Sequence, residues 1–175
     1  AWPLHRRGRR FAPAAPHRTY SDRLAVITGW RFDPVEFRIP PVTVNASDIT
    51  HWLALHTARG ALQDAALDLD TVDRARVAVI LGNSLTGEFA RSHNLRLRWP
   101  HVERSVRRAL VRSGVGGAAA DALVATIEHH YQSRLPDITE DSLAGNMSNT
   151  IAGRVAGWFD LGGGAFTMDG ACSSS

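Results

Sequence analysis

The sequence predicts an α/β fold in which helices cover a parallel sheet in layers. Two observations lead to this prediction. Short apolar runs alternate along the chain with longer segments of helical period, an order typical of layered α/β domains. The run Val77–Leu81 is apolar at every position, as expected of a central parallel strand that is covered on both faces.

For the N-terminal part of the chain, the sequence predicts a lead segment, one strand and a loop. Residues 1–21 are rich in Arg, Pro and Ala with little periodicity, so we expect a linker or a disordered lead. Arg23–Gly29 is a compact apolar run closed by Gly, which predicts a buried strand. Three prolines between residues 30 and 45 predict irregular structure there.

A capped helix, a strand and a loop are predicted next. Ser47 or Asp48 can cap the helix. Its apolar face recurs at helical spacing and comprises Trp52, Leu55, Ala58, Leu62 and Ala65. After the strand Val77–Leu81, residues 82–88 form a loop that lacks the Gly-Lys-Ser/Thr ending of a phosphate-binding loop. We expect this loop at the C-terminal end of the strand, where the sites of α/β folds gather.

Two further helices follow this loop. Pro100 occupies a favourable first position for the first of them, and Gly114 can close it. Glu103 and Arg107 are spaced to pair on its surface. The second helix is predicted over residues 118–132.

Another helix is predicted over Asn149–Phe159, with two stripes on its surface. The large apolar stripe comprises Ile151, Val155, Trp158 and Phe159. The second stripe has almost no side chains and comprises Ala152, Gly153, Ala156 and Gly157. Glycine inside a helix costs roughly 1 kcal/mol relative to alanine, so the two glycines indicate close approach of another backbone. That backbone belongs either to this chain, in ordinary helix-on-sheet packing, or to a second subunit.

The composition limits the classes of protein to which the chain can belong. The 175-residue chain contains one cysteine, has no apolar run long enough to span a bilayer, and has an Arg-rich start without the apolar segment of a secretory signal. We therefore expect a cytoplasmic protein with no membrane partner. Basic residues concentrate at 5–10 and 91–112, but no recognition motif accompanies them, so we expect no nucleic-acid partner. His129 and His130 point about 100° apart on a helix, so we expect a surface pair and no metal site.

The strongest indication of chemistry is the segment Asp169–Ser175, which contains the lone Cys172. A strand-like run, residues 165–168, precedes it, and Gly170 permits a sharp turn. A thiol on a strand-to-helix turn suits covalent acyl transfer, because it is a soft nucleophile close to backbone N–H donors. A helix that began at Cys172 would also favour the thiolate. The alternatives are an inert structural cysteine and a serine nucleophile, although no Gly-x-Ser-x-Gly elbow is present.

These residues resemble a known family. Asp169–Ser175 is similar to the active-site signature of β-ketoacyl synthases, and the resemblance covers roughly residues 23–175. Further segments similar to ketosynthase elements are residues 53–66, 77–82, 149–155, 159–161 and 163–164. Segments that most resemble the ketosynthase of iterative type I enediyne polyketide synthases are residues 83–88, 95–100 and 141–146.

The resemblance implies a thiolase-like layered αβαβα fold, of which this chain is most of the first half. Residues 22–175 would be the N-terminal part of a ketosynthase domain, truncated just after the nucleophile, and residues 1–21 the lead. The enzyme would be a homodimer, with the Gly-rich helix and the last strand near its two-fold axis. We expect the fragment alone to be inactive and poorly soluble.

The resemblance also implies an activity, that of an acyltransferase of the 3-oxoacyl-[acyl-carrier-protein] synthase type. Cys172 would take an acyl group from the phosphopantetheine of an acyl carrier protein and support decarboxylative Claisen condensation with a malonyl-carrier. No cofactor would be bound directly. The two histidines that the family uses for decarboxylation would lie beyond Ser175, so no histidine of this chain is assigned a catalytic role.

Other functions remain open from the sequence. The chain is also compatible with another thiolase-fold condensing enzyme, such as a fatty-acid 3-oxoacyl synthase or a thiolase, since these share the nucleophile. A non-catalytic partner similar to a chain-length factor is a second alternative, but such partners usually lack the cysteine found at position 172. A basic nucleic-acid-binding module is a third alternative, and salt-sensitive DNA binding would support it.

Overall fold

The computed structural model describes residues 25–84 and 87–174, and the chain divides after Arg31 into two compact units. The lead predicted over residues 1–21 lies outside the described residues. In the first unit, residues 25–29 form no strand, and Val26 and Ile27 are exposed. The buried strand predicted at Arg23–Gly29 is therefore wrong for residues 25–29. An apolar run becomes a strand only where a second strand supplies hydrogen bonds, and no described strand pairs with this one.

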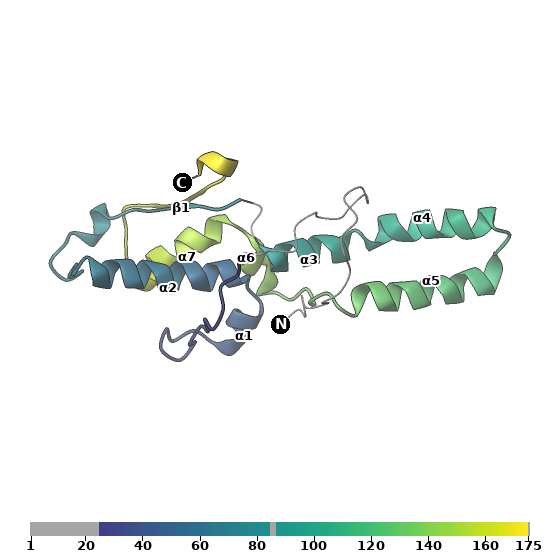
Figure 1. Ribbon diagram of the computed structural model, residues 1–175, viewed down its shortest axis with the longest axis horizontal. Helices are drawn as coiled ribbons and strands as arrows, with labels where there is room; N and C mark the ends of the chain where they lie inside the picture. The colour runs from purple at the N-terminus through teal and green to yellow at the C-terminus, as the bar shows by residue number, and fades with distance from the viewer. Residues whose placement is uncertain (1–24, 85–86, 175) are drawn as a thin grey trace. The chain divides into compact units, whose positions relative to one another are not determined.

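The second unit is rich in helix and contains one small sheet within the described residues (Figure 1). Its elements are α1 Pro41–Asn45, α2 Ile49–Asp64, the 3-10 turn η1 Arg74–Arg76, β1 Val79–Gly82, α3 Glu88–Leu97, α4 Trp99–Arg112, α5 Gly117–Gln132, α6 Ser142–Asn146, α7 Asn149–Phe159, β2 Ala165–Met168 and the 3-10 turn η2 Ala171–Ser173. In the part of the chain that the structure describes, no helix is long and apolar enough to cross a membrane.

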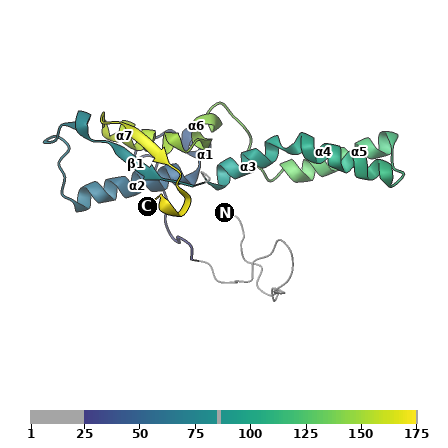
Figure 2. The ribbon, with the colours of Figure 1, turned by 90° about the horizontal axis from the view of Figure 1, so that it is seen from above.

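Strands β1 and β2 are parallel neighbours, in register from Val79 opposite Ala165 to Gly82 opposite Met168. Helix α7 packs against both strands and α2 packs against α7, so the helices cover one face of the sheet (Figures 1 and 2). The predicted parallel strand is confirmed. Within the described residues helices cover one face of the sheet only, so coverage of its second face stays a prediction. The five-layer arrangement stays a prediction.

The uncovered face of the sheet is apolar. Ile80, Phe166 and Met168 are 64%, 58% and 59% exposed. Their covered neighbour on β1, Val79, is 9% exposed and belongs to the core. The strands therefore have the composition of a two-sided sheet but are packed on one side.

The core of the second unit lies between α2, α7 and the sheet. It comprises Phe37, Leu55, Val79, Ala152, Val155, Ala156 and Phe159. The predicted start of α2 is confirmed, because the Asp48 side chain accepts a hydrogen bond from the Thr50 N–H at 3.0 Å. The second Asp48 carboxylate oxygen accepts from the Phe89 N–H at 2.8 Å, so one buried carboxylate caps both α2 and α3.

The stripe of small residues on α7 consists of two buried alanines and two exposed glycines. Ala152 and Ala156 are 0% and 7% exposed. Gly153 and Gly157 are exposed, and a Cβ added at either would have no neighbour within 4 Å among the described residues. Close approach by a backbone of the same chain is therefore not seen at these glycines, and approach by a second subunit stays a prediction.

Helices α4, α5 and α7 lie where the sequence predicts them, and Arg107 Nε lies 2.8 Å from Glu103 Oε1, as predicted. The irregular structure predicted over residues 30–45 is wrong for Pro41–Asn45, which forms α1 with proline in the first turn, a position that suits it. Helices α3 and α6 were not predicted.

Candidate functional site

Cys172 lies in the short turn η2, directly after β2, and its side chain is exposed. The turn is a three-residue piece of 3-10 helix, and the described residues form no helix longer than this around Cys172. Ala171 has a φ of +48°, in the left-handed region that L-residues rarely adopt. Gly170, which the sequence indicated for the sharp turn, has a φ of −110°. Ala171, and not Gly170, therefore adopts the unfavourable backbone conformation in this turn.

Hydrogen bonds within the turn occupy most of its backbone donors. The Ala171 N–H donates to Asp169 Oδ1 at 3.0 Å, and the Gly170 N–H donates to Ser174 Oγ at 2.7 Å. The Ser173 N–H donates to the Gly170 carbonyl at 2.9 Å. The Cys172 N–H has no hydrogen-bond partner in residues 25–84 and 87–174. An exposed thiol and a free backbone donor thus belong to one residue.

The loop that follows β1 lies beside this turn. The Asn83 N–H donates to the Met168 carbonyl at 3.0 Å. Ser84 Oγ donates to Asp169 Oδ1 at 2.7 Å. Parallel strands present their carboxyl ends at the same edge of a sheet, so the predicted position of this loop is confirmed for its described residues. Leu85 and Thr86 lie outside them. Sequence reasoning singled out the loop but missed the Ser84–Asp169 contact.

A buried polar cluster lies at the start of α2. The His51 side chain is 0% exposed, and neither ring nitrogen has a hydrogen-bond partner of good geometry within the described residues. Burial, followed by the charge of Arg154, lowers the pKa of His51 to about 4, while Asp48 and the Gly145 carbonyl act in the opposite direction. His51 is therefore neutral at pH 7.

Arg154 supplies the positive charge of this cluster from α7. Its Nη2 donates to Ser47 Oγ at 3.0 Å, and its guanidinium carbon lies 4.9 Å from the centre of the Trp52 ring. Burial lowers the pKa of Arg154, and the charge of Asp141 opposes this effect. These contacts join α2 to α7, so we interpret this cluster as structural.

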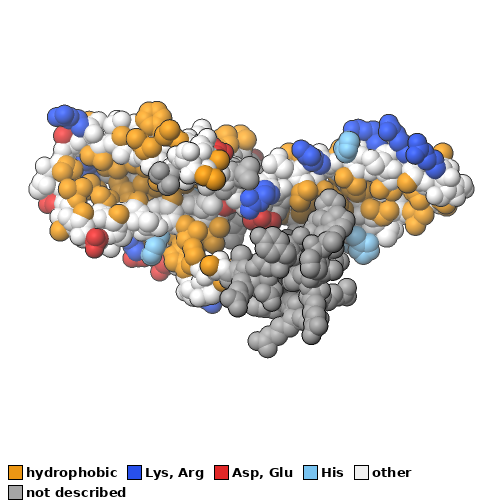
Figure 3. Space-filling model, turned by 45° about the horizontal axis from the view of Figure 1, so that its top comes forward, with side chains coloured by type: hydrophobic (Ala, Val, Ile, Leu, Met, Phe, Trp, Pro, Cys, Tyr) orange, Lys and Arg blue, Asp and Glu red, His pale blue; other side chains and the backbone are white. Residues whose placement is uncertain are grey.

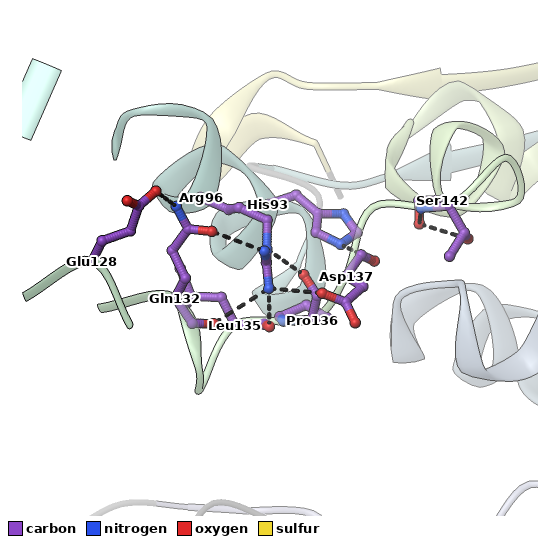
Figure 4. Close-up of polar contacts among 9 residues, drawn as sticks. His93, Arg96, Glu128, Gln132, Leu135, Pro136, Asp137 and Ser142 are labelled. Atoms are coloured by element: carbon purple, nitrogen blue, oxygen red, sulfur yellow. Dashed lines mark hydrogen bonds and ion pairs between the residues drawn. The ribbon is translucent and has the colours of Figure 1, made fainter. Parts of the chain in front are cut away.

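A second polar cluster centres on Arg96 of α3 (Figure 4). Its guanidinium donates to the carbonyls of Gln132, Leu135 and Pro136 and to the side chains of Gln132 and Asp137. His93 Nε2 lies 3.1 Å from the Asp137 carbonyl, which can only accept, so this nitrogen carries the proton. His93 Nδ1 then accepts from the Asn146 amide at 2.6 Å. Arg96 therefore joins α3 to the end of α5 and the segment after it, and the contact of Asn146 with His93 joins α6 to α3.

The basic residues of α4 form an exposed face, visible in Figure 3. Arg107 is paired with Glu103 and Asp121. Arg104, Arg108 and Arg112 recur at intervals of four along the helix, and none has an ion pair with a described residue. No recognition motif accompanies this face, so it does not by itself support the nucleic-acid alternative.

A shallow hollow of about 370 Å³ lies at the C-terminal end of α2. Its lining includes Leu62, Leu67, Arg74 and Phe159, and Cys172 is not among the lining residues. His129 and His130 are exposed on α5 with ring centroids 5.8 Å apart. The described residues contain no group of three or more His, Cys, Asp or Glu side chains that could hold a metal ion.

Comparison with known proteins shows the family of this chain. The family model described as "Beta-ketoacyl synthase, N-terminal domain" matches residues 5–175. The chain therefore belongs to the β-ketoacyl synthase family, a class of condensing enzymes. It is also 29% identical over 158 residues to one of the subunits of a polyunsaturated fatty acid synthase from a Thraustochytrium species, a match that covers 89% of this chain and 5% of that protein. No solved structure matches the chain significantly.

Proposed function

We propose that this chain is the N-terminal part of a polyketide synthase ketosynthase in which Cys172 accepts an acyl group from an acyl carrier protein. The observation that carries the proposal is the position of the exposed Cys172 thiol, on a turn where its own N–H has no partner among the described residues. Membership of the β-ketoacyl synthase family supports the reaction class. The chain spans about 5% of the length of its curated relative, so the proposal concerns a protein longer than this chain.

In the first half-reaction, the Cys172 thiolate attacks the carbonyl carbon of an acyl thioester held on phosphopantetheine. A carbon–sulfur bond to Cys172 forms while the bond to the pantetheine sulfur breaks, and pantetheine leaves as a thiolate that takes a proton from solvent. Negative charge develops on the carbonyl oxygen during this step. The Cys172 N–H is available to donate to that oxygen, which would stabilise the transition state.

The second half-reaction consumes a malonyl unit on the carrier. Loss of CO2 leaves the electron pair of the broken carbon–carbon bond on the α-carbon as an enolate. This carbon attacks the acyl group on Cys172 and forms a new carbon–carbon bond, and the Cys172 thiolate leaves. The product is a 3-oxoacyl-carrier. We expect two histidines outside this chain to assist decarboxylation, and no cofactor bound directly by the protein.

We also propose a subtype of ketosynthase within the family. Residues 83–88, 95–100 and 141–146 favour an iterative enediyne polyketide synthase. The relative in Thraustochytrium favours a second candidate, a condensing enzyme of fatty-acid synthesis. The two share the chemistry at Cys172, and the product of the complete enzyme would distinguish them. A chain-length-factor-like partner fits less well, because it would have no use for an exposed thiol at this turn.

We also propose a homodimer, with α7 near the two-fold axis. The support is that Gly153 and Gly157 face open space among the described residues. No contact with a described residue requires glycine at these two positions, and glycine would allow the backbone of a second subunit to approach.

The test is acylation of the full-length protein by an acyl carrier protein thioester, followed by peptide mass spectrometry. We expect the acyl group on Cys172, and we expect Cys172→Ala to abolish both the acyl-enzyme and the condensation product. Ser173→Ala, which changes the adjacent exposed residue, should keep the acyl-enzyme. Acylation of a different residue, or product formation by Cys172→Ala, would contradict the proposal.

A further inference from the structure

The turn that carries Cys172 needs support from outside itself. Residues 169–173 are exposed, and the turn contains only three residues of 3-10 helix. Ala171 lies in the left-handed region at a φ of +48°, which costs roughly 1 kcal/mol for a residue with a Cβ. A short exposed segment with such a residue keeps one conformation only if neighbouring groups hold it.

One such group is the hydroxyl of Ser84. Its Oγ donates to Asp169 Oδ1 at 2.7 Å, and the same carboxylate oxygen accepts from the Ala171 N–H at 3.0 Å. Asp169 therefore bridges the end of β1 to the left-handed residue that precedes the cysteine. Because Ala171 sets the direction of the chain entering Cys172, the orientation of Asp169 affects both the thiol and the Cys172 N–H.

A second support comes from Gly82, the last residue of β1. A Cβ added at Gly82 would overlap the Ser174 carbonyl oxygen and would lie 2.9 Å from Ser174 Cβ. The β1 backbone thus packs directly against the far side of the turn. The Ser174 hydroxyl in turn accepts from the Gly170 N–H at 2.7 Å, so displacement of Ser174 would disturb the whole segment.

From these two contacts we infer that Ser84 and Gly82 are positioning residues for Cys172. Ser84 acts through Asp169 and Ala171, and Gly82 acts through Ser174. Neither touches the substrate. They hold the Cys172 N–H in the direction that suits a developing oxyanion, so they affect acyl transfer more than the exposure of the thiol. This inference rests on the proposed function.

The test compares Ser84→Ala with two reference variants in the full-length protein. Ser84→Thr retains the hydroxyl. Ser105→Ala removes an exposed serine hydroxyl whose bond among the described residues stays within α4, to the His101 carbonyl at 3.2 Å. For Ser84→Ala we expect the rate of Cys172 acylation at saturating acyl-carrier to fall about tenfold with KM unchanged, since a misdirected N–H weakens oxyanion stabilisation. Ser84→Thr should restore the rate to within about threefold, and Ser105→Ala should leave it unchanged.

Two further measurements separate positioning from loss of structure. Alkylation of Cys172 by iodoacetamide needs a reachable thiolate but no oxyanion donor, so its rate should stay within about twofold in Ser84→Ala. Hydrogen exchange of the Ala171 amide should accelerate about tenfold in Ser84→Ala and not in Ser105→Ala. Gly82→Ala should slow acylation as Ser84→Ala does. Gly60→Ala should not, because its added Cβ meets no described atom within 4 Å.

The outcomes are distinct. Unchanged Ala171 exchange in Ser84→Ala, wild-type acylation in that variant, or a parallel loss of alkylation would overturn the inference. If the parent protein is not acylated at Cys172 but Ser84→Ala still accelerates Ala171 exchange, the proposed function fails while the structural support of the turn by Ser84 stands.

Discussion

His51 gives the molecule a specific sensitivity to acid. Its pKa is lowered from 6.5 to about 4, first by burial and then by Arg154. Between these values the unfolded chain binds a proton that the folded chain does not bind, so this contribution to stability is complete above pH 6.5 and declines as the pH falls toward 4. The full loss corresponds to about 3 kcal/mol at most.

Urea unfolding from pH 7.5 to 4 checks this prediction. The free energy of unfolding should decrease with acid in the parent protein, and His51→Gln should remove most of that slope whatever its absolute stability. His129→Gln, which changes an exposed histidine, should keep the parent slope. Equal slopes in the parent protein and in His51→Gln would show that His51 is not the group responsible.

Single residues differ in how far the sequence reveals their part in the site. The position of Cys172 on a turn after a strand could be predicted, because its signature is local and contiguous. The support by Ser84 could not, since it depends on the parallel register of β1 and β2, which joins residues 85 positions apart in sequence. The sequence also assigned the tight turn to Gly170, although Ala171 adopts the left-handed conformation. The tertiary hydrogen bond from Ser84 holds the Asp169 carboxylate that accepts from the Ala171 N–H.

At the scale of elements, helix α7 offers a test of the proposed second subunit. Gly153 and Gly157 are helical and a Cβ at either meets no described atom within 4 Å. In an isolated chain, Gly153→Ala and Gly157→Ala should each stabilise the protein by up to about 1 kcal/mol, because alanine is the better helix former. In the full-length protein, the same changes should weaken dimerisation if a second backbone packs there.

Thermal unfolding and sedimentation velocity distinguish these effects. Gly145→Ala serves as a control for a crowded glycine, because its added Cβ would overlap the Ala46 carbonyl, and it should destabilise the chain at any concentration. Unchanged dimerisation in both α7 variants would argue against a dimer contact at this stripe.

Elements with a strong pattern were predictable and weakly patterned ones were not. Helices α2, α4, α5 and α7 were predicted by an apolar stripe, a cap or a favourably placed proline. Helices α1 and α6 have five residues each, too few for a helical period to show. Helix α3 begins at Glu88, inside the loop predicted over residues 82–88, because the buried Asp48 carboxylate caps it from another part of the chain.

At the scale of the whole molecule, composition and order were enough for the α/β class and for a parallel strand. They could not show how many faces of the sheet are covered, because that depends on which elements pack against it. The run Val77–Leu81 is apolar throughout, yet Ile80 is 64% exposed. The apolar pattern of β1 therefore indicates a second covered face that the described residues do not supply, as the predicted layered fold requires.

This uncovered face predicts how residues 1–175 behave when expressed alone. Ile80, Phe166 and Met168 are exposed side by side on β1 and β2, and an apolar patch of this kind favours association. We expect concentration-dependent self-association by light scattering and binding of a hydrophobic dye, both reduced in the double variant Ile80→Thr with Phe166→Thr. Val35→Thr changes an isolated valine that is 83% exposed in a turn, and it should leave both signals unchanged. A chain that stays monomeric at high concentration, melts cooperatively and binds no dye would show that this apolar face is already covered.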